Sequence, residues 1–249
     1  ELEKELVKRQ GTLSFPPIAF VSATVLSLFG LSCVCAVAQQ SVRASPVMSH
    51  AMKIPALPPA SVERELDAFA HAVSGISTYS ATVTVFDRKG SQTQNTVFDY
   101  TFSKPSKVRV HVVAGTNTGI TLDWNGGPTI VAHRGSGLMA LFSKTLSLHD
   151  PLVTTLQGAS IDQLSFGAIL SHAQQEVGRL SLSSDGTIDG VAANALTLIP
   201  SASAPGAGLT REVVEMSAAT HLPMRVLGYD GPTLVSSVGF SNIKLTARE

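Results

Sequence analysis

The chain has 249 residues, with 18 basic and 18 acidic side chains, so its formal net charge is zero. Charged residues make up only 14% of the chain, which excludes the basic footprint that nucleic acids and anionic lipid surfaces require. Both of its two cysteines, Cys33 and Cys35, fall in one apolar segment, so the rest of the chain cannot form thiolate metal centres or cysteine redox pairs.

That apolar segment is the first predicted element, an uncharged run over residues 18–38 that follows two basic residues and ends in Ala-Val-Ala at Ala38. The pattern predicts a secretory signal with a small-residue cleavage site, and hence a periplasmic protein. An uncleaved inner-membrane anchor is the alternative, because a spanning helix needs about 20 apolar residues. Lipid attachment at Cys33 or Cys35 is a third, although neither has an aliphatic residue three positions upstream.

The predicted domain organisation follows from this segment. Residues 1–38 form the signal, and residues 39–60 carry four prolines with no periodic pattern, which is typical of a flexible, partly extended linker. Residues 61–249 are long enough to form one domain that buries a core without disulfides.

The domain begins with an amphipathic helix, predicted over residues 61–74. Its apolar residues Val62, Leu66, Phe69 and Val73 are spaced by four, three and four, and a glycine follows as a stop. This apolar stripe must cover another element.

Five antiparallel strands follow, because segments rich in β-branched and aromatic residues alternate with turn signals. In the third strand, Lys107, Arg109 and His111 share one face, and three valines share the other. The predicted strands are 79–88, 93–103, 107–113, 120–124 and 129–134.

A second helix is predicted from Ile161 to about Gln175, because Ser160 and Gln163 have the spacing of a capping box. The remaining strands are 179–183, 191–199, 209–216, 223–229 and 234–245, with a loop at 201–208. Nine or ten strands without strand–helix alternation predict an α+β fold with a large curved antiparallel sheet.

Several motifs resemble the LolA/LolB-like periplasmic lipoprotein-carrier superfamily, in particular an uncharacterised outer-membrane lipoprotein-sorting branch. The resemblance spans about residues 61–247. It rests on short motifs, which are His221–Val226, Tyr229–Gly231, Val238–Leu245, Leu148–Leu152, Phe102, Lys104-Pro105 and Arg109.

The resemblance implies an incomplete β-barrel whose concave side is covered by helices and holds acyl chains in an apolar cavity. The alternative for the inward-facing residues is a packed core. The residues expected to line the cavity are Leu66, Phe69, Val83, Val85, Phe98, Tyr100, Val108, Val110 and Leu164. The expected head-group ligands are Lys107 and Arg109, for which the alternative is the solvated outer face of a strand.

No catalytic or metal-binding constellation is evident, so we expect neither an enzyme nor a cofactor. The seven histidines are scattered, with no metal-binding spacing. The glycines around Ser136 adjoin it, whereas a hydrolase nucleophile elbow needs them two residues away.

Two functions are compatible with these features. The first is a carrier of lipid or acylated lipoprotein, with membrane-associated proteins that deliver and receive the cargo. The second is a periplasmic sensor or interaction module that binds a partner protein through a sheet face or edge and carries no cargo.

Overall fold

The computed structural model describes residues 59–135, 143–200 and 208–247, all within the compact unit that spans residues 51–249. The predicted signal segment, the linker up to residue 58, Ser136 and most of the 201–208 loop lie outside the described residues. Predictions about them stay predictions.

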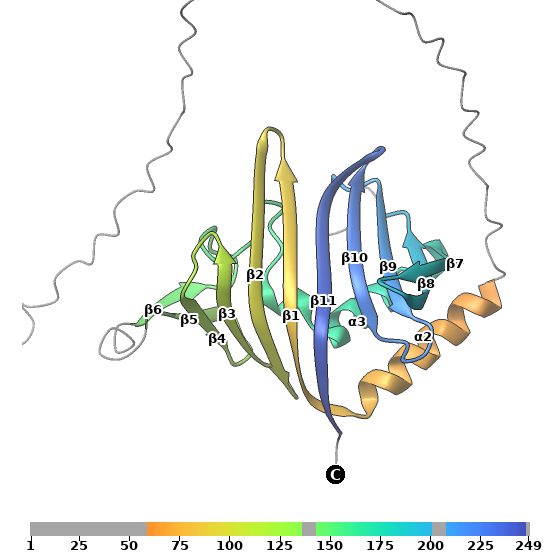
Figure 1. The fold of residues 1–249 in the computed structure, drawn as a ribbon, viewed down its shortest axis with the longest axis horizontal. Helices are drawn as coiled ribbons and strands as arrows, with labels where there is room; N and C mark the ends of the chain where they lie inside the picture. The colour runs from red at the N-terminus through yellow and green to blue at the C-terminus, as the bar shows by residue number, and fades with distance from the viewer. Residues whose placement is uncertain (1–58, 136–142, 201–207, 248–249) are drawn as a thin grey trace, which may run out of the picture. The chain divides into compact units, whose positions relative to one another are not determined.

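The described residues form one antiparallel sheet of eleven strands (Figure 1). The strand order is β6-β5-β4-β3-β2-β1-β11-β10-β9-β8-β7. The first six strands are β1 (Ile76–Lys89), β2 (Gln92–Ser103), β3 (Lys107–Gly115), β4 (Ile120–Trp124), β5 (Thr129–Arg134) and β6 (Ser143–Ser147). The last five are β7 (Leu180–Ile188), β8 (Val191–Leu198), β9 (Arg211–Ser217), β10 (Pro223–Asp230) and β11 (Thr233–Ala247).

The strand order divides the sheet into two meanders. The chain runs outward from β1 to β6, crosses to β7 at the opposite edge, and returns strand by strand to β11, which pairs with β1. Both edge strands, β6 and β7, have one neighbour each among the described strands, so the sheet is open. This confirms the predicted α+β fold built on an incomplete, antiparallel barrel.

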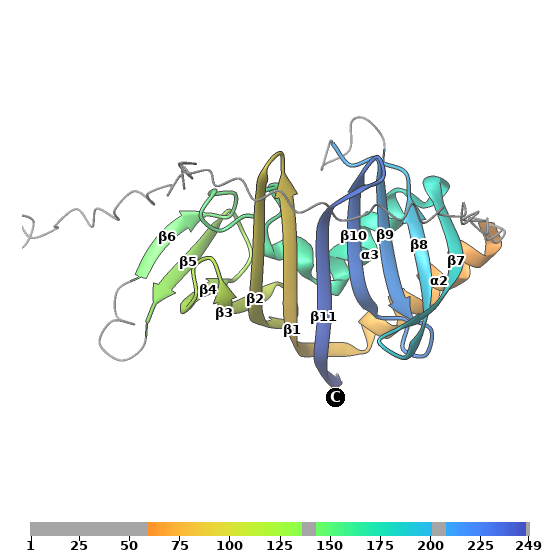
Figure 2. The same cartoon turned by 45° about the horizontal axis from the view of Figure 1, so that its top comes forward.

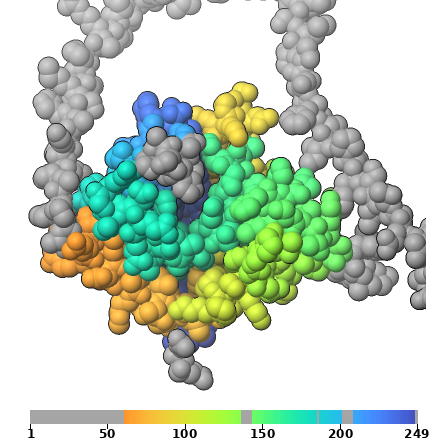
Figure 3. All heavy atoms as spheres, turned by 180° about the vertical axis from the view of Figure 1, so that it is seen from behind, coloured from red at the N-terminus to blue at the C-terminus, as the bar shows by residue number. Residues whose placement is uncertain are grey.

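Two helices cover one face of this sheet, as Figures 1 and 2 show. Helix α2 (Pro59–Ser74) precedes β1, and α3 (Phe166–Gln175) lies in the crossing between the two meanders. Two short 3-10 helices, η3 (Ile161–Leu164) and η4 (Val177–Arg179), flank α3. Figure 3 shows this helical side, with α2 in orange beside the green and teal segments that follow β6.

The core lies between the helices and the sheet, because the alternation of side chains sends one set inward from every strand. Strand β3 shows this clearly, since Val108, Val110 and Val112 are buried and the intervening residues are exposed. From α2, the predicted stripe residues Val62, Leu66 and Phe69 are buried in the same core. Burying each such side chain stabilises the fold by about 1.5–3 kcal/mol.

The structure differs from the sequence-based prediction in three elements. Strand β7 continues through a bulge after Ser184 to Ile188, beyond the predicted end at residue 183. Strand β6 was not predicted, so the sheet has eleven strands instead of nine or ten. The predicted helix over residues 161–175 is two helices, because Ser165 has an extended backbone between η3 and α3. Its hydroxyl accepts a hydrogen bond from the Ala168 N–H at 3.1 Å and thereby begins a new helix.

Candidate functional site

The candidate site is a pocket of about 620 Å³ between the two helices and the sheet. Its volume falls within the range of about 300–1,000 Å³ that is typical of small-ligand sites. The apolar side chains around it come from α2, β1, β2 and α3. The lining residues are Val73, Ile76, Ser77, Tyr79, Phe102, Lys104, Pro105, Phe166 and Gly167.

The register of the first hairpin explains why aromatic rings meet at this pocket. Tyr79 pairs directly with Phe102, so the two residues extend from the same face of the sheet, and their ring centroids are 5.5 Å apart. Phe166, the first residue of α3, stacks on Tyr79 with a centroid separation of 4.2 Å and an interplanar angle of 1°. The three rings form one apolar surface.

A hydrogen bond fixes this stack, because the Phe166 N–H donates to the Tyr79 hydroxyl at 3.1 Å. It provides a partner for one of the backbone donors that every helix leaves open in its first turn. Burial raises the pKa of the Tyr79 hydroxyl far above its usual range, and burial has the same effect on the neighbouring Tyr100. Both phenols therefore remain neutral in the folded protein at ordinary pH.

Lys104 is the charged residue that lines the pocket, in the turn between β2 and β3. Its ammonium group donates to the carbonyl oxygens of Val73 at 2.9 Å and Ser74 at 3.0 Å, at the carboxyl end of α2. Its backbone N–H also donates to the Ser77 carbonyl oxygen at 2.9 Å. Because Lys104 is exposed, the pocket meets solvent beside its side chain.

The nine residues that we expected to line a cavity are all buried in the hydrophobic core between the helices and the sheet. None of them is among the residues that line this pocket, so their role as a lining stays a prediction. The sequence-based reasoning did not single out most of the residues that line this pocket. Two features of the sequence pointed to some of these residues. The apolar stripe of the first predicted helix includes Val73, and the motifs that resemble the LolA/LolB-like superfamily include Phe102, Lys104 and Pro105.

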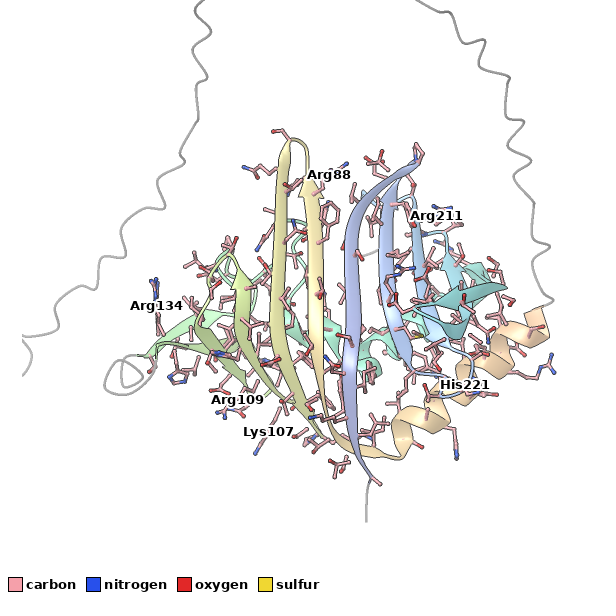
Figure 4. All side chains as sticks on the ribbon, in the orientation of Figure 1. Arg88, Lys107, Arg109, Arg134, Arg211 and His221 are labelled. Atoms are coloured by element: carbon pink, nitrogen blue, oxygen red, sulfur yellow. The ribbon has the colours of Figure 1, made fainter. Side chains whose placement is uncertain are left out.

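The two expected head-group ligands lie on the other face of the sheet. Val110 and Tyr100 point inward as a pair, so Arg109 and Lys107 point outward, and Figure 4 shows both at the lower end of β3. Arg109 donates to both carboxylate oxygens of Asp123, at 2.7 and 3.2 Å, and this partner raises the pKa of its guanidinium. The structure therefore brings neither side chain to the pocket.

A second polar cluster holds α2 against the other half of the sheet. Glu65, with 9% of its side chain exposed, lies 2.9 Å from His221 Nδ1 and accepts a hydrogen bond from the Asn194 amide at 3.3 Å. Figure 4 shows His221 beside α2. This cluster positions α2, whose carboxyl end lines the pocket.

Two features are absent from the described residues. They contain no group of three or more histidine, cysteine, aspartate or glutamate side chains that could hold a metal ion. They also contain no helix that is long and apolar enough to cross a membrane.

No protein-family model and no curated protein matches this chain. Solved structures similar to it include LprF from Mycobacterium bovis, at 14% identity over 78% of this chain and 99% of that chain, with a TM-score of 0.44. A putative outer membrane lipoprotein-sorting protein domain from Vibrio parahaemolyticus has 15% identity over 74% and 93%, with a TM-score of 0.37. A LolA superfamily protein from Nitrosomonas europaea has 11% identity over 78% and 96%, with a TM-score of 0.33.

One of these structures is a member of the superfamily that the sequence motifs resemble.

Proposed function

We propose that this protein is a non-catalytic binder of a hydrophobic ligand of the acyl-chain type. The observation that supports the proposal is the pocket of about 620 Å³ between helices and sheet, whose side chains are mostly apolar. Each methylene moved from water into such a pocket contributes about 0.8 kcal/mol, so one acyl chain can bind without a covalent step. With the export signal predicted at residues 18–38, binding would take place in the periplasm.

The first test is native mass spectrometry with lipid extraction on the purified chain, before and after incubation with phospholipid vesicles that also contain free fatty acid. The expected result is an acyl-bearing ligand in stoichiometric amount. A mass that corresponds to the empty protein under both conditions contradicts the proposal.

Gly167 provides a variant that occupies the pocket. It lines the pocket in the first turn of α3, and a Cβ added to it meets no atom within 4 Å. Gly167→Phe therefore adds a ring without a backbone clash, and it should fill pocket volume and abolish ligand retention while the protein stays folded. Gly178→Phe is the matched control, because Gly178 has the same open surroundings but lies in η4, outside the pocket lining.

The alternative, an interaction module, has one observation in its favour. Strands β6 and β7 are unpaired along their outer edges among the described residues, and an extended segment of a partner protein pairs with such an edge. If the wild-type chain stays empty and Gly167→Phe behaves like wild type, this alternative becomes the better explanation.

A further inference from the structure

The lining of the pocket has one charged side chain among mostly apolar ones. Aromatic and aliphatic side chains supply most of the lining, whereas Lys104 lies where the pocket meets solvent. A ligand that fits this distribution has an apolar tail and one polar head.

The other polar side chains of the lining are neutral, and each already takes part in a hydrogen bond. The Ser77 hydroxyl lies 3.1 Å from the carbonyl oxygens of Thr246 and Ala247 on the neighbouring strand β11. The Tyr79 hydroxyl accepts the Phe166 N–H. Lys104 is thus the charged group of the lining, and its ammonium keeps one donor for a ligand.

The Lys104 ammonium has three N–H donors, and the two carbonyl oxygens of α2 account for two of them. Both acceptors lie at the carboxyl end of α2, whose partial negative charge compensates part of the ammonium charge. No carboxylate of the described residues forms an ion pair with Lys104, so its positive charge is not fully neutralised. The carbonyl oxygens also restrain the long side chain at the pocket mouth, which lowers the entropic cost of binding an anion there.

We infer that Lys104 binds the anionic head group of a single-chain acyl amphiphile whose tail occupies the pocket. This inference rests on the proposed function and adds the ligand class: a carboxylate or phosphate anion on one alkyl chain. Charge-assisted hydrogen bonds of the N⁺–H···O⁻ kind are stronger than neutral ones, so head-group charge should set the order of affinities.

The test compares three ligands with the same twelve-carbon tail, namely dodecanoate, dodecyl phosphate and dodecanol, by isothermal titration calorimetry at pH 8 and low salt, below micelle formation. We expect wild type to bind the two anions about tenfold more tightly than dodecanol, in keeping with a hydrogen bond between charged groups. The ratio of the dissociation constants of dodecanoate and dodecyl phosphate shows whether the site prefers a carboxylate or a phosphate head group. Because salt screens exposed charges, the preference should shrink in about 1 M salt.

Lys104→Gln should reduce the ratio of anion affinity to dodecanol affinity to about one, while the affinity for dodecanol stays unchanged. Lys104→Arg should retain the preference for the anions. Lys107→Gln is the matched control, because Lys107 belongs to the same turn region but points away from the pocket (Figure 4). An anion preference that survives Lys104→Gln overturns the inference. So does an equal loss of dodecanol binding, which would show that Lys104 only holds α2 in place.

The same titrations separate a failure of the proposed function from a failure of the inference about Lys104. Wild type that binds none of the three ligands contradicts the proposed function and the inference together. Wild type that binds all three with equal affinity contradicts the inference alone, since the pocket then accepts the tail without selecting the head.

Discussion

Tyr79 connects the sheet to α3 through two different contacts. Its ring stacks on Phe166, and its hydroxyl accepts the backbone N–H of the same residue. One side chain at the pocket therefore supplies both an apolar ring contact and a hydrogen-bond acceptor for α3. A substitution that removes only the hydroxyl separates the two contributions.

Tyr79→Phe keeps the ring but leaves the buried Phe166 N–H without an acceptor. A buried donor that loses its partner costs about 1–3 kcal/mol, and we expect urea denaturation to show a loss of that size in the free energy of unfolding. Tyr100→Phe is the comparison, because it removes the contact between the two hydroxyls and the longer 3.5 Å bond to the Ile161 carbonyl oxygen but keeps the acceptor of the Phe166 N–H. Losses of equal size in the two variants would contradict the importance of the Tyr79 bond.

The same two tyrosines predict a loss of stability in alkali. Burial raises the pKa of both hydroxyls above 10.0, the value expected in the unfolded chain. Below pH 10 both states are protonated, and above it the unfolded state alone releases the protons, so stability falls as pH rises. Tyrosinate absorbance of two of the three tyrosines should appear together with the loss of circular dichroism, and ionisation of all three in a folded protein would refute this.

Glu212 predicts a second pH dependence, at lower pH. Burial raises its pKa above the usual 4.5, and His172, 3.5 Å away, lowers it by a smaller amount. The folded state therefore holds this proton longer than the unfolded state, and the residue destabilises the fold as pH rises above about 4.5. Glu212→Gln should raise the melting temperature at pH 7–8 but not at pH 4, whereas the exposed control Glu63→Gln should have no such effect.

Among the helices and strands, the sequence predicted the elements whose hydrophobic pattern lies within their own residues. The alternating valines of β3 and the stripe of α2 carry their own periodicity, and both elements were found. Strand β6 has the sequence Ser-Lys-Thr-Leu-Ser, with one buried residue, Leu146, and its strand structure depends on pairing with β5. Such an edge strand has almost no signal in its own sequence.

The pocket could not be predicted from local pattern for a related reason. Its lining combines the end of α2, the start of β1, the turn after β2 and the start of α3, and Tyr79 and Phe166 are 87 residues apart. Inward alternation marks a residue as buried but does not distinguish a packed core from a cavity wall. The nine residues expected at the cavity therefore lie in the core.

Helix α2 depends on the Glu65 cluster for its position. Glu65→Ala removes the acceptor for the Asn194 amide and the partner of His221, and truncating one member of a buried polar group costs about 1–3 kcal/mol. We expect a loss of that size by urea denaturation, together with weaker ligand binding because α2 contributes Val73 to the pocket.

Glu63→Ala serves as the control, since Glu63 is exposed on the same helix and should change the free energy of unfolding by less than about 0.5 kcal/mol. Equal effects of the two substitutions would show that the cluster does not hold α2.

At the scale of the whole folded unit, the pocket lies close to the junction of the two meanders. Tyr79 of β1 pairs with Phe102 on one side and with Leu245 of β11 on the other. Helix α3 belongs to the crossing segment, and α2 contacts β8 and the β9–β10 turn through the Glu65 cluster. A ligand in the pocket therefore contacts elements that bridge both halves of the sheet, whereas β4, β5 and β6 lie far along one of them.

This arrangement predicts a specific pattern of hydrogen–deuterium exchange on ligand binding. Ligand at about 100 times its Kd stabilises the bound state by about 2.7 kcal/mol, and this slows exchange only at amides whose opening releases the ligand. With dodecanoate, we expect slower exchange in peptides that cover residues 70–80 and 164–170, and little change over residues 143–147, where edge opening leaves the pocket intact. Slower exchange concentrated at β6 or β7 would instead indicate that the ligand occupies a sheet edge. Gly167→Phe, which fills the pocket, should abolish the slowing around the pocket but leave any slowing at an edge strand in place.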